Sequence, residues 1–173
     1  MNPVSQKKGS LRALLLPAMA LLFLSSFLHT VFAAEAGNDA VVIRSVQGDF
    51  DSVWEDLNTA LTNRGLVVSD VSHVGQMLDR TGKALGRTKK IFARAKVLEF
   101  CSAVVSRDMM EQNPHFIAFC PYNIAVYTLP NEKNKVYLSY RRPIWNDKSG
   151  KAALEEVEKL LDGIVSDVVE QKD

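Results

Sequence analysis

The chain has 173 residues, a length typical of one domain, and its composition of 47% hydrophobic and 24% charged residues is that of an ordinary globular protein. Three of the 21 Lys and Arg residues and none of the 20 Asp and Glu residues precede residue 34, so the remainder holds 18 basic against 20 acidic residues. A nearly neutral body lacks the positive charge of a dedicated nucleic-acid binder, and we expect no nucleic-acid partner.

The first 33 residues have the pattern of a secretory signal peptide. Residues 2–12 are polar and basic, residues 13–28 are apolar, and Val31 and Ala33 form the small-residue pattern of a cleavage site. The apolar run is shorter than the roughly 20 residues of a spanning helix, which makes an uncleaved anchor the weaker alternative. We therefore predict cleavage after about Ala33, and a periplasmic or secreted protein without membrane contact once the signal is removed.

The mature chain is predicted to contain a short linker over residues 34–40 and one domain over residues 41–173. The first half of this domain alternates strands and helices. β-branched residues predict a strand, and apolar residues at helical spacing after the capping candidates Asp51 and Ser52 predict a helix that stops at Gly65. The predicted elements are a strand over 41–47, a helix over 52–64, a strand over 66–74 and a helix over 76–85.

A run of basic residues follows the second predicted strand. Seven Lys and Arg residues and no acidic residue lie between Arg80 and Lys96. One interpretation is a site for an anion or an acidic partner, and the other is a solvated, partly irregular helix surface. We favour the solvated surface. Gly82 and Lys83 do not have the glycine spacing of a phosphate-binding loop.

The second half is rich in strands. Alternation over 96–101 places Glu99 and Cys101 on one face and Leu98 and Phe100 on the other. The predicted elements are strands over 96–101, 115–121, 123–129 and 135–140, and helices over 102–113 and from about 150 to 169. Because consecutive strands favour antiparallel pairing, the order β-α-β-(α)-β-α-β-β-β-α predicts a single small α+β domain with helices packed on one mainly antiparallel sheet.

The chain has two cysteines, Cys101 and Cys120, and each lies at the end of a predicted strand. In an exported protein they are candidates for a disulfide bond. Alternatively, Cys101 is a reactive thiol, since it directly precedes a predicted helix whose free N–H groups favour a thiolate. Glu99, on the same strand face, would oppose that effect.

Other candidate ligands are few. Tyr122 and Arg141 lie in the hairpin region and are candidates for a pocket that binds an anion. No Cys-x-x-Cys, Cys-x-x-Cys-His or His-Glu-x-x-His motif occurs, and no nucleophile–base–acid set stands out. We expect no catalytic residues, no metal and no cofactor; copper or haem bound through Cys and Met is the weaker alternative.

The segments 99–103, 119–127 and 140–143, with the strand–helix start over 42–66, resemble the domain-of-unknown-function 302 family. Cys101 matches the first cysteine position of the family. Many relatives carry the second cysteine directly after the proline, where this chain has Tyr122, and Cys120 instead precedes Pro121. The resemblance implies a TATA-binding-protein-like α+β fold, a tendency to dimerise and, through exported relatives encoded beside sulfur-oxidation genes, a link to thiol or sulfur chemistry.

We therefore expect an exported accessory or binding protein rather than an enzyme. The first hypothesis is that it binds a small ligand or sulfur species near Cys101, with Glu99, Cys120, Tyr122 and Arg141 as further candidate ligands. The alternative is a protein-interaction or dimerisation module held by a Cys101–Cys120 disulfide, without chemistry of its own. The expected partners are a second copy of the chain, a small ligand or a periplasmic protein.

Overall fold

The computed structural model describes residues 40–146 and 150–172. The predicted leader and almost all of the predicted linker lie outside these residues. The elements are β1 (Val41–Gln47), α1 (Phe50–Asn63), β2 (Val67–Ser72), α2 (Val74–Ala84), β3 (Arg94–Cys101), α3 (Ala103–Gln112), the 3-10 helix η1 (Pro114–Phe119), β4 (Tyr122–Thr128), β5 (Lys135–Arg141) and α4 (Lys151–Glu170). None of the described helices has the length and apolar character needed to cross a membrane.

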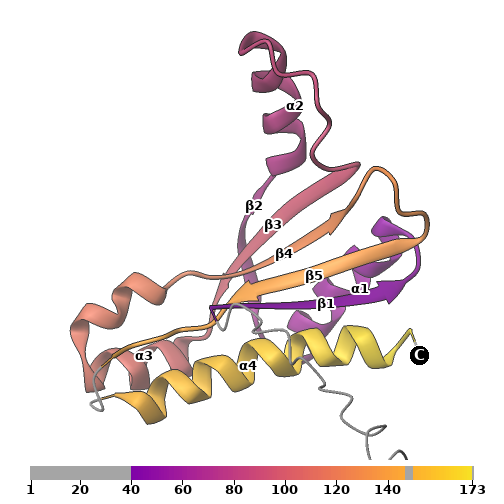
Figure 1. Cartoon of the computed structure of the whole chain (residues 1–173). Helices are drawn as coiled ribbons and strands as arrows, with labels where there is room; N and C mark the ends of the chain where they lie inside the picture. Colours follow the sequence, from indigo (N-terminus) through magenta and orange to yellow (C-terminus); the bar gives the residue numbers. More distant parts are fainter. Residues whose placement is uncertain (1–39, 147–149, 173) are drawn as a thin grey trace, which may run out of the picture. The chain divides into compact units, whose positions relative to one another are not determined.

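The described part of the chain forms one α+β domain built on a five-stranded antiparallel sheet in the order β1-β5-β4-β3-β2 (Figure 1). Alternate strand residues, such as Val42, Leu138, Ile124 and Leu98, are buried on one face. They form a single core with the apolar sides of α1, α3 and α4. Because apolar residues alternate along the strands, the helices cover only one face of the sheet. The other face is open, and Ile43 on it is 52% exposed.

The structure confirms the predicted fold class and corrects two local predictions. The helix α1 begins at Phe50, because the Asp49 carboxylate, rather than Asp51 or Ser52, accepts hydrogen bonds from the N–H groups of the next turn at 2.8 and 3.1 Å. Gly65 ends the helix with φ of +69°, as predicted.

The predicted strand over 115–121 is wrong, because residues Pro114–Phe119 form the 3-10 helix η1. The Asn113 side chain accepts a hydrogen bond from the His115 N–H at 3.0 Å, and Pro114 occupies the first helical position. Phe116 and Phe119 are three residues apart and meet at a ring distance of 5.8 Å, which a helical turn allows and a strand does not. The sheet therefore has five strands rather than six.

Helix α2 is joined to the sheet through a close backbone approach at Gly75. A Cβ atom at this position would lie 2.9 Å from the Ala95 nitrogen and 3.2 Å from its carbonyl oxygen. We expect Gly75→Ala to lower the free energy of unfolding by about 1–3 kcal/mol in urea titrations, since two backbone segments would have to separate. Gly163→Ala is the control: its Cβ would meet only the flexible Arg64 side chain, at 3.1 Å, and should leave stability unchanged or raised.

Candidate functional site

The two cysteines meet at one end of the sheet. Strand β3 ends at Cys101, and Ser102 then caps α3 by accepting a hydrogen bond from the Val105 N–H at 3.3 Å. The chain returns through η1, which ends at Cys120, and enters β4 with Tyr122 paired to Phe100. This return places the Cys120 sulfur 2.7 Å from the Cys101 sulfur.

A buried polar pair supports Cys120 from the helix side. The Ser106 hydroxyl of α3 lies 3.8 Å from the Cys120 sulfur and 3.0 Å from the Tyr122 hydroxyl. Tyr122 is 3% exposed and packs edge-on against Phe100 at a ring distance of 5.8 Å. Burial raises the pKa of Tyr122, while the hydrogen bond from Ser106 opposes the rise. The phenol is therefore neutral and holds Ser106 beside the thiol.

The Cys101 thiol is kept protonated. Its partial burial, the hydrogen bond with Cys120 and the charge of Cys120 raise the pKa of Cys101 to about 11, and the charge of Glu99 adds to the rise. A backbone hydrogen bond from Tyr122 opposes these effects. The pKa shift is thus opposite to the one predicted from the position before α3, and Cys101 is better suited to donate a hydrogen bond than to act as a thiolate.

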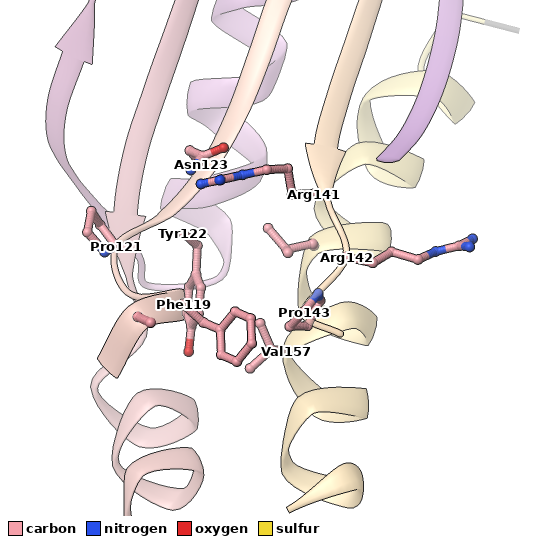
Figure 2. Close-up of a pocket in the computed structure, with 10 residues that line it drawn as sticks. Phe119, Pro121, Tyr122, Asn123, Arg141, Arg142, Pro143 and Val157 are labelled. Atoms are coloured by element: carbon pink, nitrogen blue, oxygen red, sulfur yellow. The ribbon is translucent and has the colours of Figure 1, made fainter. Parts of the chain in front are cut away.

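A cavity of about 160 Å³ is lined by Phe119 and Pro121, the two chain neighbours of Cys120 (Figure 2). Strands β4 and β5 pair only from Ala125 to Tyr127, so the two strands separate before they reach this end of the sheet. Helix α4 closes the gap with Val157 and Leu161. The residues that line the cavity are Ala118, Phe119, Pro121, Tyr122, Asn123, Arg141, Arg142, Pro143, Val157 and Leu161.

The two arginines at this cavity differ in their partners. Arg142 forms an ion pair with Glu158 of α4 at 2.8 Å. The Arg141 side chain extends toward Asn123 in Figure 2, and no ion pair joins it to another described residue. Arg141 therefore offers a guanidinium whose donors are open to an anion.

The structure brings together most of the predicted site residues. Cys101 and Cys120 are in contact, Ser106 links Cys120 to Tyr122, and Tyr122 and Arg141 line one cavity. Glu99 pairs with Asn123 across β3 and β4 and affects Cys101 through its charge, but it does not line the cavity.

Sequence reasoning missed Ser106 and Asn123. Ser106 could have been found, because it lies three residues before the buried Met109 on the inward side of α3. Met109, a candidate ligand in the copper alternative, is fully buried in the core. Asn123 carries no signal by itself, because its place at the cavity depends on where β4 and β5 separate.

The raised pKa of Cys101 gives a testable pH dependence. We expect the rate of Cys101 alkylation by iodoacetamide to rise with a midpoint of about pH 11 instead of the ordinary 9.0. Because folding favours the neutral thiol, its contribution to stability is complete below about pH 9 and is lost as the pH rises through about 11.

Peptide mapping of the alkylated protein checks this midpoint. Cys120→Ser should lower it, since the substitution removes the sulfur that hydrogen-bonds to Cys101 and whose thiolate form would repel a Cys101 thiolate, while the burial of Cys101 stays. An unchanged midpoint in Cys120→Ser would contradict the coupling between the two sulfurs.

The fold and site define a small single-domain α+β protein with a pair of adjacent thiols at one end of an antiparallel sheet. Residues 42–168 match the family model described as domain of unknown function DUF302, and the chain belongs to this family. The structure is similar to the crystal structure of an uncharacterised conserved DUF302 protein from Bacillus stearothermophilus, with a TM-score of 0.61, 19% sequence identity, and coverage of 74% of this chain and 97% of that chain. A comparison with curated proteins finds no match.

Proposed function

We propose that the protein is an exported accessory protein that binds a small, anionic sulfur-containing ligand at the Cys101–Cys120 pair. The observation that carries this proposal is the 2.7 Å approach of the two sulfurs at an end of the sheet where Cys101 is exposed. Arg141 at the cavity, which has no ion pair with another residue in the described part of the chain, supplies the donor for an anionic group of the ligand. Tyr122, which lines the cavity and reaches Cys120 through Ser106, connects the two parts of the site.

The chemistry that two adjacent thiols perform is exchange with a disulfide. One protein thiol first loses its proton to water, and its sulfur then attacks a sulfur of the ligand disulfide; the ligand S–S bond breaks, a mixed disulfide forms, and the released ligand thiolate takes up a proton. The second protein thiol then loses its proton and attacks the mixed disulfide, forming the Cys101–Cys120 bond and releasing the second ligand thiol. The protein loses two electrons, and the ligand disulfide gains them.

Two aromatic disulfides of different charge test the anion preference. The reduced protein is mixed with the dianionic 5,5′-dithiobis(2-nitrobenzoate) or with the neutral 2,2′-dithiodipyridine, and thiol release is followed by absorbance. We expect Arg141→Gln to slow the reaction with the dianion about 3-fold relative to the neutral reagent, because a nearby charge is removed. Arg107→Gln on α3, 78% exposed, is the matched control and should change neither rate.

Equal effects of Arg141→Gln on the rates with the two reagents would contradict the assignment of Arg141 as an anion donor.

Mass spectrometry of the unmodified protein from the exported fraction tests the location and the thiols together. It should show a chain that begins near residue 34 and has lost the leader.

A second candidate function is favoured by the open face of the sheet. Val41 is 38% and Ile43 is 52% exposed on this face. Arg141 pairs with Val41 in register, and Glu99 lies on the same face. If two copies paired through this face around a two-fold axis, Arg141 of one copy would lie near Glu99 of the other. In this second candidate function the protein is a dimerisation module, and a Cys101–Cys120 disulfide within each copy holds its fold.

Sedimentation equilibrium of the purified protein tests this module. We expect Ile43→Glu to shift the dimer to monomer, while Ile144→Glu, at a site 50% exposed outside the sheet, should leave the mass unchanged. A monomer in the unsubstituted protein would remove the dimer proposal and leave the ligand proposal intact.

A further inference from the structure

Helix α2 and the segment that follows it form a projecting arm, defined as residues 74–91. In Figure 1 the helix extends away from the sheet, and the chain turns at its tip and runs back to β3. Gly75 packs on the Ala95 backbone at the base of the arm, and all residues from 83 to 91 are exposed. The core of the domain therefore does not account for the composition of this arm.

The arm is strongly basic. Between Leu78 and Ile91 it carries one acidic residue, Asp79, and five basic ones, which are Arg80, Lys83, Arg87, Lys89 and Lys90. Only Lys90 has an ion pair among the described residues, at 3.5 Å from Asp79. The remaining charge is concentrated on one small projection, whereas the other residues from 34 onward hold 13 basic against 19 acidic residues, so the arm is the part that attracts a strongly anionic surface.

Exposed apolar side chains lie between these bases. Leu85 at the tip is 68% exposed and lies between Lys83 and Arg87; Ile91 is 47% and Met77 is 41% exposed. A purely electrostatic contact would not require large apolar side chains at the tip. Basic residues interleaved with exposed apolar ones, here along the end of α2 and the segment after it, are typical of elements that bind the interface of an anionic bilayer.

The arm is already ordered for docking. Gly86 turns the chain with φ of +67°, and the Arg87 N–H donates to the Gly82 carbonyl at 2.8 Å. The Leu85 N–H donates to the Thr81 carbonyl at 3.0 Å, which closes the last turn of the helix. A preformed tip loses little conformational freedom on binding, so little of the binding free energy of its surface contacts is offset by the cost of ordering the arm.

We propose that the arm docks the protein on the surface of an anionic lipid bilayer, with its lysines and arginines at the headgroups and Leu85 inserted between them. The exposure of Leu85 and Ile91 therefore argues against the expectation that the mature protein has no membrane contact. The base of the arm packs at Ala95, near the start of β3, and the two sulfurs lie at the other end of this strand, so docking through the arm is independent of the thiol site.

Flotation with lipid vesicles tests the proposal. The exported protein is mixed with phosphatidylcholine vesicles containing about 30% phosphatidylglycerol, a surface charge that attracts basic segments, or with phosphatidylcholine alone. We expect binding only to the anionic vesicles, and release at high ionic strength. Lys83→Glu combined with Lys89→Glu should lower the partition coefficient at least about 20-fold, since each base near such a surface contributes about 5-fold.

Matched variants separate the bilayer from other anions. Lys133→Glu combined with Lys151→Glu makes the same change of charge elsewhere and should change binding far less. Leu85→Ser should weaken vesicle binding about 5-fold, whereas Val104→Ser, at an equally exposed valine of α3, should not. All variants share one N-terminus, so any contribution of the leader cancels.

Binding to polyglutamate or to an acidic protein without binding to anionic vesicles would overturn the proposal in favour of an acidic protein partner. Vesicle binding that is insensitive to Leu85→Ser would also overturn it, because the inserted tip would then be absent. Circular dichroism of each variant confirms that the fold is retained.

Discussion

Oxidation of the Cys101–Cys120 pair with diamide is expected to raise the free energy of unfolding by about 3 kcal/mol. The two sulfurs are already 2.7 Å apart, so forming the bond requires little movement of the sheet or of η1. The gain arises in the unfolded chain, where a bridge between residues 101 and 120 closes a loop and removes conformational entropy. The effect corresponds to a rise of about 10 °C in melting temperature for a domain of this size.

Thermal melts of reduced and diamide-treated protein measure this gain. Cys101→Ser and Cys120→Ser should each abolish the difference between the two conditions while melting close to the reduced unsubstituted protein. An oxidised protein that melts at the temperature of the reduced one would contradict the geometry of the pair.

Counting the free thiols of the unsubstituted protein, taken directly from the exported fraction, separates the two proposed functions. Two free thiols per chain would support the ligand-binding dithiol, and none would support the disulfide-held module. A rapid return of both thiols with a mild reductant would keep the exchange chemistry available.

Phe116→Ala is expected to lower the free energy of unfolding by about 3–5 kcal/mol. Phe116 is fully buried; its ring packs edge-on against Trp145 at 5.3 Å and is tilted against the ring of Phe119 at 5.8 Å. The alanine would leave a cavity that η1 cannot close, because the neighbouring backbone is held by the pairing of β4 with β3. Urea unfolding measures the loss.

The substitution also has a local consequence that a general loss of stability would not produce. Because η1 ends at Cys120, we expect Cys120 in Phe116→Ala to react faster with a maleimide under conditions where the protein remains folded. Ile117→Ala, at a neighbouring residue that is 63% exposed, is the control and should change stability by less than about 0.5 kcal/mol. An unchanged thiol rate in Phe116→Ala would mean that Phe116 does not position Cys120.

Much of the fold could be predicted because it depends on short-range patterns. Alternation in β3 placed Leu98 and Phe100 on the face opposite Glu99 and Cys101, which the structure shows to be the core face, and Gly65 marked the end of α1, where a positive φ is required. The segment 114–119 could not be assigned in this way. Its apolar residues are compatible with a strand as well as with a short helix. The hydrogen bond to the Asn113 side chain and the burial of Phe116 stabilise the helix.

The features of the candidate site likewise divide into those set by local sequence and those set by tertiary contacts. The sequence by itself determined that Cys101 lies at the end of a strand, that Glu99 and Cys101 share a strand face, and that a basic run follows the second strand, because these depend on residue identity and local periodicity; its placement of Cys120 at the end of a strand was wrong. The tertiary structure alone decided that the sulfurs touch, that the pKa of Cys101 is raised instead of lowered, that β4 and β5 separate to form a cavity, and that Leu85 is exposed at the tip of an arm. Each of these depends on the distance between segments far apart in the chain, which the antiparallel pairing of β3 and β4 and the packing of α3 and α4 set.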